Sequence, residues 1–145
     1  MPDRVVLDAN VLVAALYDND SLHSVAMETI NRIEGSSRRT VILDFLLLEA
    51  LSVLGRRARE RKTLPPNFDE CVERAKEWRA ASAIRDVSHL FAVHWSEVLE
   101  VMASTGGKLN ANDALLVALQ RAGVIDDVAT FDENLAAFPG FKRFA

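Results

Sequence analysis

Short runs of β-branched and apolar residues alternate with longer helical segments along this 145-residue chain. Strands are predicted at 4–7, 40–43, 90–93 and 127–130, with a last edge strand at 141–144. Helices are predicted over 10–16, from a cap at Asp20 or Ser21 to Gly35, and over 44–61, 67–83, 96–103 and 114–122. Strands that alternate with helices form parallel sheets covered on both faces. The predicted fold is therefore α/β, with a central, mainly parallel sheet between two helical layers, in a single domain spanning 1–145.

Composition narrows the class of protein. Half of the residues are hydrophobic and 26% are charged, which is typical of a folded globular domain. Cys71 is the only cysteine, so an intrachain disulfide and a cysteine-based zinc site are both excluded. The longest apolar runs, Val11–Leu16 and Ala114–Leu119, are too short to span a membrane, and the N-terminus does not resemble a signal peptide. We expect a cytoplasmic protein without membrane association.

Four acidic residues lie directly beside apolar, core-forming sequence: Asp8, Glu49, Asp113 and Asp132. A desolvated carboxylate without a partner is unfavourable and tends to take up a proton. Four of them, from distant parts of the chain, indicate one shared pocket in which a cation compensates the lost hydration. The formal charge of −4 does not exclude a polyanionic partner, because without these four acids the 17 basic residues face 17 acidic ones.

The predicted strand ends place the acids in the same region. Asp8 and Asp132 fall at or just past two strands, and ligands of open α/β sheets bind beyond the carboxyl ends of the strands. Glu49 and Asp113 lie in the first turns of helices that can face the same crevice. Carboxylate oxygens suit hard cations such as Mg²⁺, and two such ions promote phosphodiester cleavage by activating water and stabilising the leaving oxygen. The pattern predicts a divalent-metal hydrolase.

Four motifs occur in order: Val-Leu-Asp-Ala-Asn-Val-Leu-Val at 6–13, Glu49 on the third predicted helix, Asn-Asp-Ala-Leu-Leu at 112–116 and Ala-Thr-Phe-Asp at 129–132. Together they resemble the PIN-domain nucleases, most closely the VapC-type toxins of toxin-antitoxin pairs. The resemblance spans nearly the whole chain. It implies a PIN-like three-layer fold, Mg²⁺- or Mn²⁺-dependent endonucleolytic cleavage of RNA, an antitoxin protein that blocks the site, and a homodimer.

The same resemblance assigns roles to particular residues. Asp8, Glu49, Asp113 and Asp132 match the metal-binding acids of the family, and Asn10 and Thr130 match the polar residues beside them. Asp8 and Asp113 would bind a metal directly, while Glu49 and Asp132 would bind a second ion or act through water.

Each acid also has a purely structural interpretation. Asp8 and Asp132 can cap the helices that follow them, and Asp113 can interact with a helix dipole. Glu49 is hardest to explain in this way, because leucine-rich sequence surrounds it. The structural interpretations require four independent coincidences, whereas one metal site explains all four positions.

Arg56 is the candidate for binding RNA, because it lies seven residues after Glu49 and so on a similar helix face. The competing interpretation is a solvated charge favoured by the helix C-terminus.

Two other functions are considered for the whole chain. A phosphatase of the haloacid-dehalogenase type would need an acid/base Asp two residues after its nucleophile, where this chain has Asn10. A non-catalytic binding or scaffold domain would have no need to keep all four acids.

Overall fold

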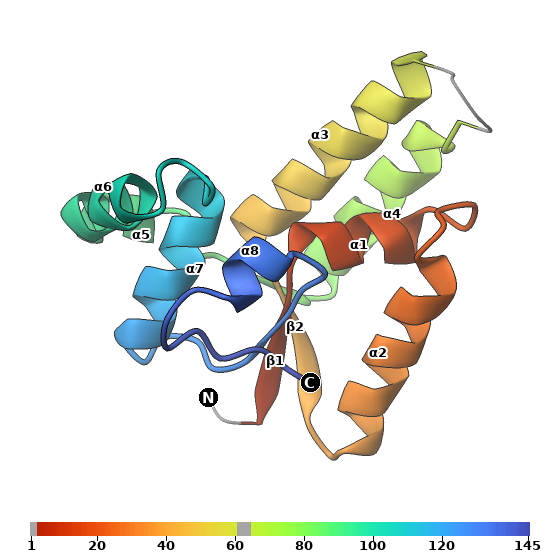
Figure 1. Cartoon of the computed structure of the whole chain (residues 1–145). Coiled ribbons are helices and arrows are strands. Elements are labelled where there is room, and N and C mark those ends of the chain that lie inside the picture. The colour runs from red at the N-terminus through yellow and green to blue at the C-terminus, as the bar shows by residue number, and fades with distance from the viewer. Residues whose placement is uncertain (1–2, 61–64) are drawn as a thin grey trace.

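The central sheet of the computed structural model is entirely parallel within the described residues, 3–60 and 65–145. Its strand order is β3-β2-β1-β4, and Figure 1 shows the arrangement of the elements around it. In chain order the elements are β1 (Arg4–Leu7), α1 (Ala9–Leu16), α2 (His23–Gly35), β2 (Arg39–Leu43), α3 (Asp44–Glu60), α4 (Phe68–Ala80), β3 (Ile84–Arg85), α5 (Leu90–Val93), α6 (Trp95–Ser104), α7 (Ala111–Arg121), β4 (Val128–Ala129) and α8 (Glu133–Ala136). The predicted α/β fold class is confirmed.

Strand β1 lies in the interior of the sheet, between β2 and β4. Val5 pairs with Thr40 of β2, and Val6 pairs with Val128 of β4. Val5 and Val6 are fully buried, as expected for a β-branched strand covered on both faces. Because parallel strands all end at the same edge, the residue after β1 lies beside the residue after β4.

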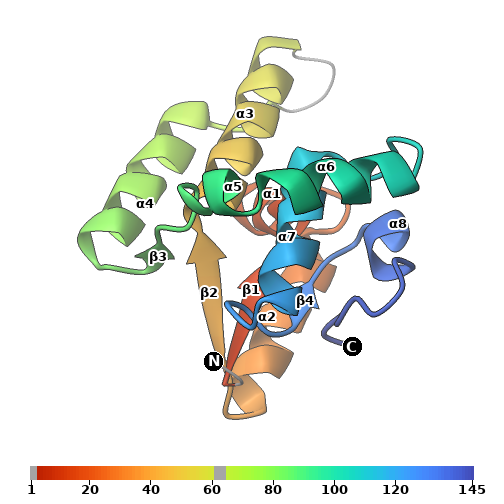
Figure 2. The same ribbon diagram turned by 90° about the vertical axis from the view of Figure 1, so that its left-hand side faces the viewer.

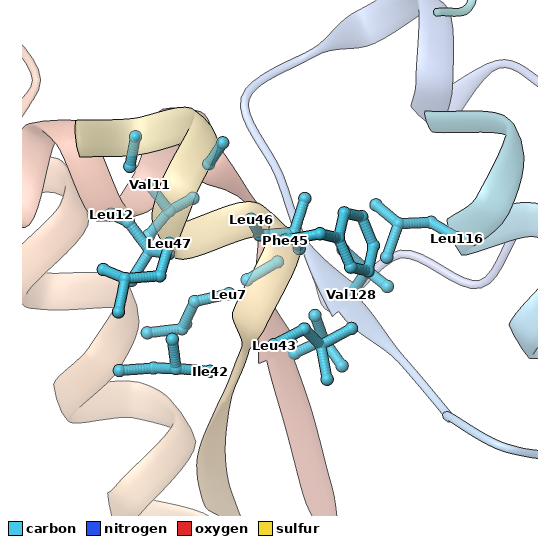
Figure 3. Packing of buried hydrophobic residues seen from close by; sticks show 14 of the residues in the cluster. Leu7, Val11, Leu12, Ile42, Leu43, Phe45, Leu46, Leu47, Leu116 and Val128 are labelled. Carbon is cyan, nitrogen blue, oxygen red and sulfur yellow. The ribbon is translucent and has the colours of Figure 1, made fainter. Parts of the chain in front are cut away.

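Helices cover both faces of this sheet. Figures 1 and 2 show α1 and α2 on one side and α7, with α6 beside it, on the other. Side chains from both layers meet the strands in the core: Figure 3 shows Leu12 and Leu47 on one side and Phe45 and Leu116 on the other. Truncating a buried leucine of this kind to alanine typically costs about 2–5 kcal/mol. The apolar runs in the sequence therefore supply the side chains that pack the two helical layers against the sheet.

Two predictions in the middle of the chain were wrong. The helix predicted to reach Ala83 ends at Ala80, and Ile84–Arg85 then forms β3 by pairing with β2. Ser82 at the turn has a φ of 57°, which is incompatible with a continuing helix. The segment predicted as a strand, 90–93, is helix α5 instead.

The carboxylate of Asp44 accounts for the start of α5. It accepts hydrogen bonds from the backbone N–H groups of Val87 and Ser88 and so fixes the turn that leads into the helix. An apolar run of only four residues does not by itself distinguish a strand from a buried helix.

Smaller differences occur at element ends. Helix α2 has Leu22 at its N-cap, without a side-chain cap, rather than Asp20 or Ser21. The predicted edge strand at 141–144 is reduced to one parallel bridge, between Val128 and Arg143. The predicted end of the third helix at Arg61 lies outside the described residues. No helix in the described ranges is long and apolar enough to cross a membrane.

Candidate active site

Asp8 follows the last residue of β1 and is only 3% exposed. It is also the N-cap of α1, because its Oδ1 accepts a hydrogen bond of 2.8 Å from the backbone N–H of Ala9. The predicted capping role is thus present, but it uses one carboxylate oxygen. The second oxygen, Oδ2, is turned toward the end of β4.

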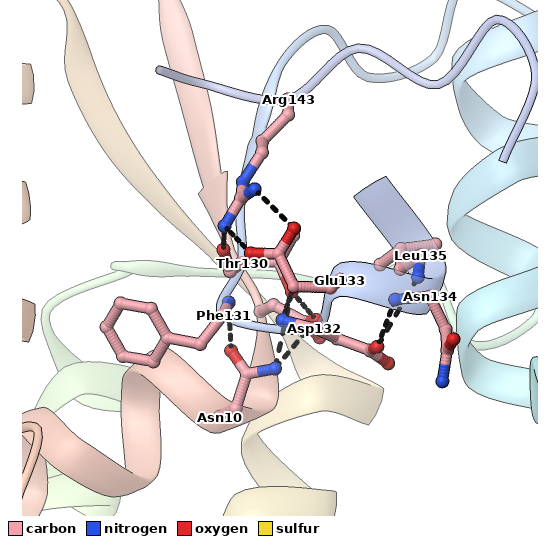
Figure 4. Close-up of polar contacts among 9 residues, drawn as sticks. Asn10, Thr130, Phe131, Asp132, Glu133, Asn134, Leu135 and Arg143 are labelled. Carbon is pink, nitrogen blue, oxygen red and sulfur yellow. Dashed lines mark hydrogen bonds and ion pairs between the residues drawn. The ribbon is translucent and has the colours of Figure 1, made fainter. Parts of the chain in front are cut away.

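Thr130 and Asn10 hold this second oxygen. The Thr130 hydroxyl donates to Asp8 Oδ2 at 2.7 Å, and the Asn10 amide Nδ2 lies 3.4 Å from the same atom and 3.3 Å from Thr130 Oγ1. Asn10 Oδ1 accepts from the backbone N–H of Phe131, as Figure 4 shows. The adjacent ends of β1 and β4 are therefore joined by a polar network that fixes the orientation of Asp8.

Asp132 extends the network into α8. Its backbone N–H donates to Thr130 Oγ1, and its Oδ1 caps α8 by accepting from the N–H groups of Asn134 and Leu135. Arg143 lies behind this segment: its Nη2 donates to the carbonyl oxygen of Thr130 at 2.9 Å, and its guanidinium pairs with Glu133 (Figure 4). Sequence reasoning did not identify Arg143, because the contact depends on a long-range approach of the last residues.

Asp113 lies in the first turn of α7 and is half-buried. It forms a capping box with Asn110, in which its Oδ2 accepts from the backbone N–H of Asn110 and Asn110 Oδ1 accepts from the N–H of Asp113. As with Asp8, the predicted structural role and the proximity to the other acids coexist.

Glu49 is half-buried on α3 and lines a pocket of about 290 Å³ together with Asp8 and Asn10. Arg57, two turns further along α3, lines the same pocket. Arg56, the predicted RNA-binding residue, lines a separate hollow with Leu48 and Phe68 and is absent from the lining of this one. The spacing Glu49, Val53, Arg57 follows the four-residue ridge of the helix, and it is the signal that would have identified Arg57.

The electrostatics of the acids show that they share one environment. The pKa of Asp8 is raised to about 6, mainly by burial and to a lesser extent by the charges of Glu49 and Asp132, against the hydrogen bonds from Thr130 and Ala9. The pKa of Asp113 is raised to about 7, mainly by burial and then by the charges of Asp8, Asp132 and Glu49, against the hydrogen bond from the backbone of Asn110. The charges of Glu49 and Asp132 thus act on both Asp8 and Asp113, and the charge of Asp8 acts on Asp113.

The donor set suits a hard divalent cation. Its groups are carboxylates. Asp8 and Asp113 are desolvated, and neighbouring acids further disfavour their charged forms, which is the situation that a bound cation relieves. Among residues 3–60 and 65–145, no group of three or more His, Cys, Asp or Glu side chains is placed so that it could hold a metal ion. Mg²⁺ does not require such a group, because it commonly keeps several waters and binds through one or two carboxylates.

The architecture and the site together define the class: a parallel α/β domain with an acidic site at the carboxyl ends of its central strands. The PIN domain family model matches residues 5–140, and the chain belongs to this family. No curated protein sequence matches significantly. The crystal structure of Mycobacterium tuberculosis VapC20, described as a toxin that cleaves the Sarcin-Ricin loop, is similar in fold with a TM-score of 0.68 at 18% identity, over 97% of this chain and 98% of that one.

Proposed function

We propose that this protein is a divalent-metal-dependent endoribonuclease and the toxin of a VapC-type toxin-antitoxin pair. The observation that carries the proposal is the position of Asp8: a buried carboxylate at the end of the central strand, oriented by Thr130 and Asn10 and electrostatically coupled to the other acids. Membership of the PIN domain family and the likeness to VapC20, a toxin that cleaves RNA, support it.

The residues have distinct roles in this proposal. Asp8 and Asp113 bind Mg²⁺ or Mn²⁺, and Glu49 and Asp132 bind a second ion or hold a water. A bound divalent cation supplies the positive charge that lowers the pKa of a water and stabilises the oxygen that leaves phosphorus. Thr130 and Asn10 keep Asp8 in one orientation, which limits the reorganisation needed on binding.

A phosphatase of the haloacid-dehalogenase type fits the geometry less well. The position of its acid/base is occupied by Asn10, whose amide donates toward Asp8 and Thr130 and whose carbonyl accepts from Phe131. An amide held in this way does not transfer protons at neutral pH. A non-catalytic scaffold leaves the two raised carboxylate pKa values without a use.

The first test is cleavage of RNA by the purified, antitoxin-free protein with Mg²⁺ or Mn²⁺ and with EDTA. A Sarcin-Ricin stem-loop belongs among the substrates, because VapC20 acts on that loop. Asp8→Asn should reduce cleavage by more than about 100-fold, beyond the 10- to 100-fold that loss of an orienting partner typically causes. Asp69→Asn, an exposed aspartate on α4, is the control with the same change in charge and should retain activity.

Two results would contradict the proposal. One is cleavage that persists in EDTA or in Asp8→Asn, which would indicate a contaminating nuclease or another mechanism. The other is the absence of any calorimetric binding of Mg²⁺ or Mn²⁺ by the wild-type protein, which would favour the scaffold interpretation.

A further inference from the structure

The pocket beside the acids has two unlike walls. One wall comes from α1 and the segment before α2 and includes Val13, Asp20 and Leu22. The other comes from α3 and includes Glu49, Val53 and Arg57, and Asp8 after β1 also lines the pocket. The volume of about 290 Å³ is close to the lower end of the range for small-ligand sites, which begins at about 300 Å³. It is large enough for part of a nucleotide but not for a folded partner.

Among the described residues that line this pocket, Arg57 is the one with a positive charge. Its Nη1 donates to Asp20 Oδ2 at 2.6 Å, and its side chain is 42% exposed whereas that of Asp20 is 11% exposed. Asp20 is fixed in turn, because its Oδ1 accepts from the backbone N–H of Leu22 at 2.9 Å. The carboxylate thus holds the guanidinium at the rim of the pocket through one of its five N–H donors.

A polyanionic substrate needs such a cation here. Asp8, Glu49, Asp113 and Asp132 repel phosphate, and a divalent ion offsets this repulsion only at the scissile group. A neighbouring phosphate has to be held by a separate positive charge. Arginine suits this task, because its guanidinium binds phosphate oxygens through two parallel N–H groups.

We propose that Arg57 binds the RNA phosphate adjacent to the one that is cleaved, with the intervening sugar lying between Leu22 and Val53. Asp20 pairs with Arg57 through one N–H group, which leaves the other guanidinium donors for this phosphate. The inference rests on the proposed ribonuclease function and identifies one contact through which the protein binds its substrate. It adds Arg57 to Arg56, whose expected contact with RNA remains a prediction.

The competing explanation is that Arg57 and Asp20 form only a structural ion pair between α3 and the segment before α2. The two explanations differ in what happens when Asp20 loses its charge. A structural pair is broken equally by changing either partner. A phosphate-binding Arg57 is lost in Arg57→Gln, but it remains cationic and available in Asp20→Asn, whose side-chain oxygen can still accept from Leu22.

The experiment compares the full-length wild-type protein with Arg57→Gln, Asp20→Asn and Arg79→Gln in steady-state cleavage of one RNA. Arg79 is the control, because it also pairs with an aspartate, Asp86, but does not line the pocket. Arg57→Gln should raise KM about tenfold and change kcat by less than about twofold. The slope of log KM against log salt concentration should fall by the amount expected for about one phosphate contact. Asp20→Asn should leave KM unchanged or lower it, and Arg79→Gln should match the wild type.

Equal increases in KM for Arg57→Gln and Asp20→Asn would overturn the inference in favour of a structural pair. An unchanged KM in Arg57→Gln would overturn it as well. Cleavage by the wild-type protein tests the proposed function separately. If the wild type does not cleave, the same variants are compared for binding of a fluorescent RNA oligonucleotide with Mg²⁺, and equal affinity of Arg57→Gln and wild type would overturn the inference.

Discussion

The two sides of the acidic site are built differently. On the hydrogen-bonded side, Asp8, Asn10 and Thr130 are tied together where β1 and β4 end. On the pocket side, Glu49 and Arg57 border an open hollow, and Arg57 has a single carboxylate partner. The first side fixes where a cation would lie, whereas the second leaves room for a substrate. Changes on the first side should therefore affect the catalytic step and stability, and changes on the second should affect substrate binding.

Stability without metal should depend strongly on the charges of two carboxylates, Asp113 and the more deeply buried Asp8. Its pKa is raised from 3.8 to about 6, so between about pH 4 and pH 6 the folded protein keeps a proton that the unfolded chain releases. The free energy of unfolding therefore falls as pH rises through this window, by up to about 3 kcal/mol for Asp8. Asp113, with a pKa of about 7, extends the fall to higher pH.

Asp8→Asn isolates this contribution, because asparagine caps a helix as well as aspartate does. In EDTA, urea denaturation should show the variant to be more stable than wild type at pH 8, with the difference disappearing near pH 4. Addition of Mg²⁺ should stabilise the wild type more than the variant, because binding to the folded state adds to its stability. If the two proteins differ in stability by the same amount at every pH, burial does not disfavour the ionised form of Asp8.

Thr130→Val should have the next largest effect. The Thr130 hydroxyl donates to Asp8 and accepts from Asn10 and from the N–H of Asp132, which valine leaves without an acceptor. We expect a loss of activity of about tenfold, in kcat rather than KM, and a loss of about 1–3 kcal/mol in stability. Thr130→Ser keeps the hydroxyl and should recover most of both. An unchanged kcat in the valine variant would mean that the network does not orient Asp8.

The smallest effect is expected at Arg143. Arg143→Met removes the donor to the Thr130 carbonyl and the pairing with Glu133. Thermal denaturation should show a loss of about 1 kcal/mol, and activity should fall about two- to threefold. Glu133→Gln breaks only the exposed ion pair and should change stability by less than about 0.5 kcal/mol. If both variants lose the same stability, the bond to Thr130 contributes nothing.

The sequence predicted the structure best where neighbouring residues alone determine the local conformation. Strand β1 and its terminal Asp8 were predicted with the observed bounds, because a β-branched run and a cap are local features. Helix α7 was also predicted, although its start at Ala111 lies three residues before the predicted one because Asn110 is the cap. The roles assigned to Asp8, Glu49, Asp113 and Asp132 remain predictions, although the fold brings their charges into one environment.

The errors occurred where tertiary contacts decide the local structure. Strand β3 has only two residues and is defined by its pairing with β2, so its own sequence is too short to predict a strand. Asp44 determines the conformation before 90–93 from more than forty residues away. Arg56 and Arg57 are neighbours in sequence, but they line different hollows, and the RNA-binding role expected of Arg56 remains a prediction.

The order of the sheet has a consequence for how the protein is made. Strand β1 is synthesised first but needs β4 as a neighbour, and the Thr130 hydroxyl that holds Asp8 belongs to a residue 122 positions later. A growing chain emerges from its N-terminus, so the site cannot be assembled until most of the sequence has been translated. For the proposed ribonuclease, a nascent chain that has not yet exposed β4 therefore lacks the Thr130 contact that orients Asp8.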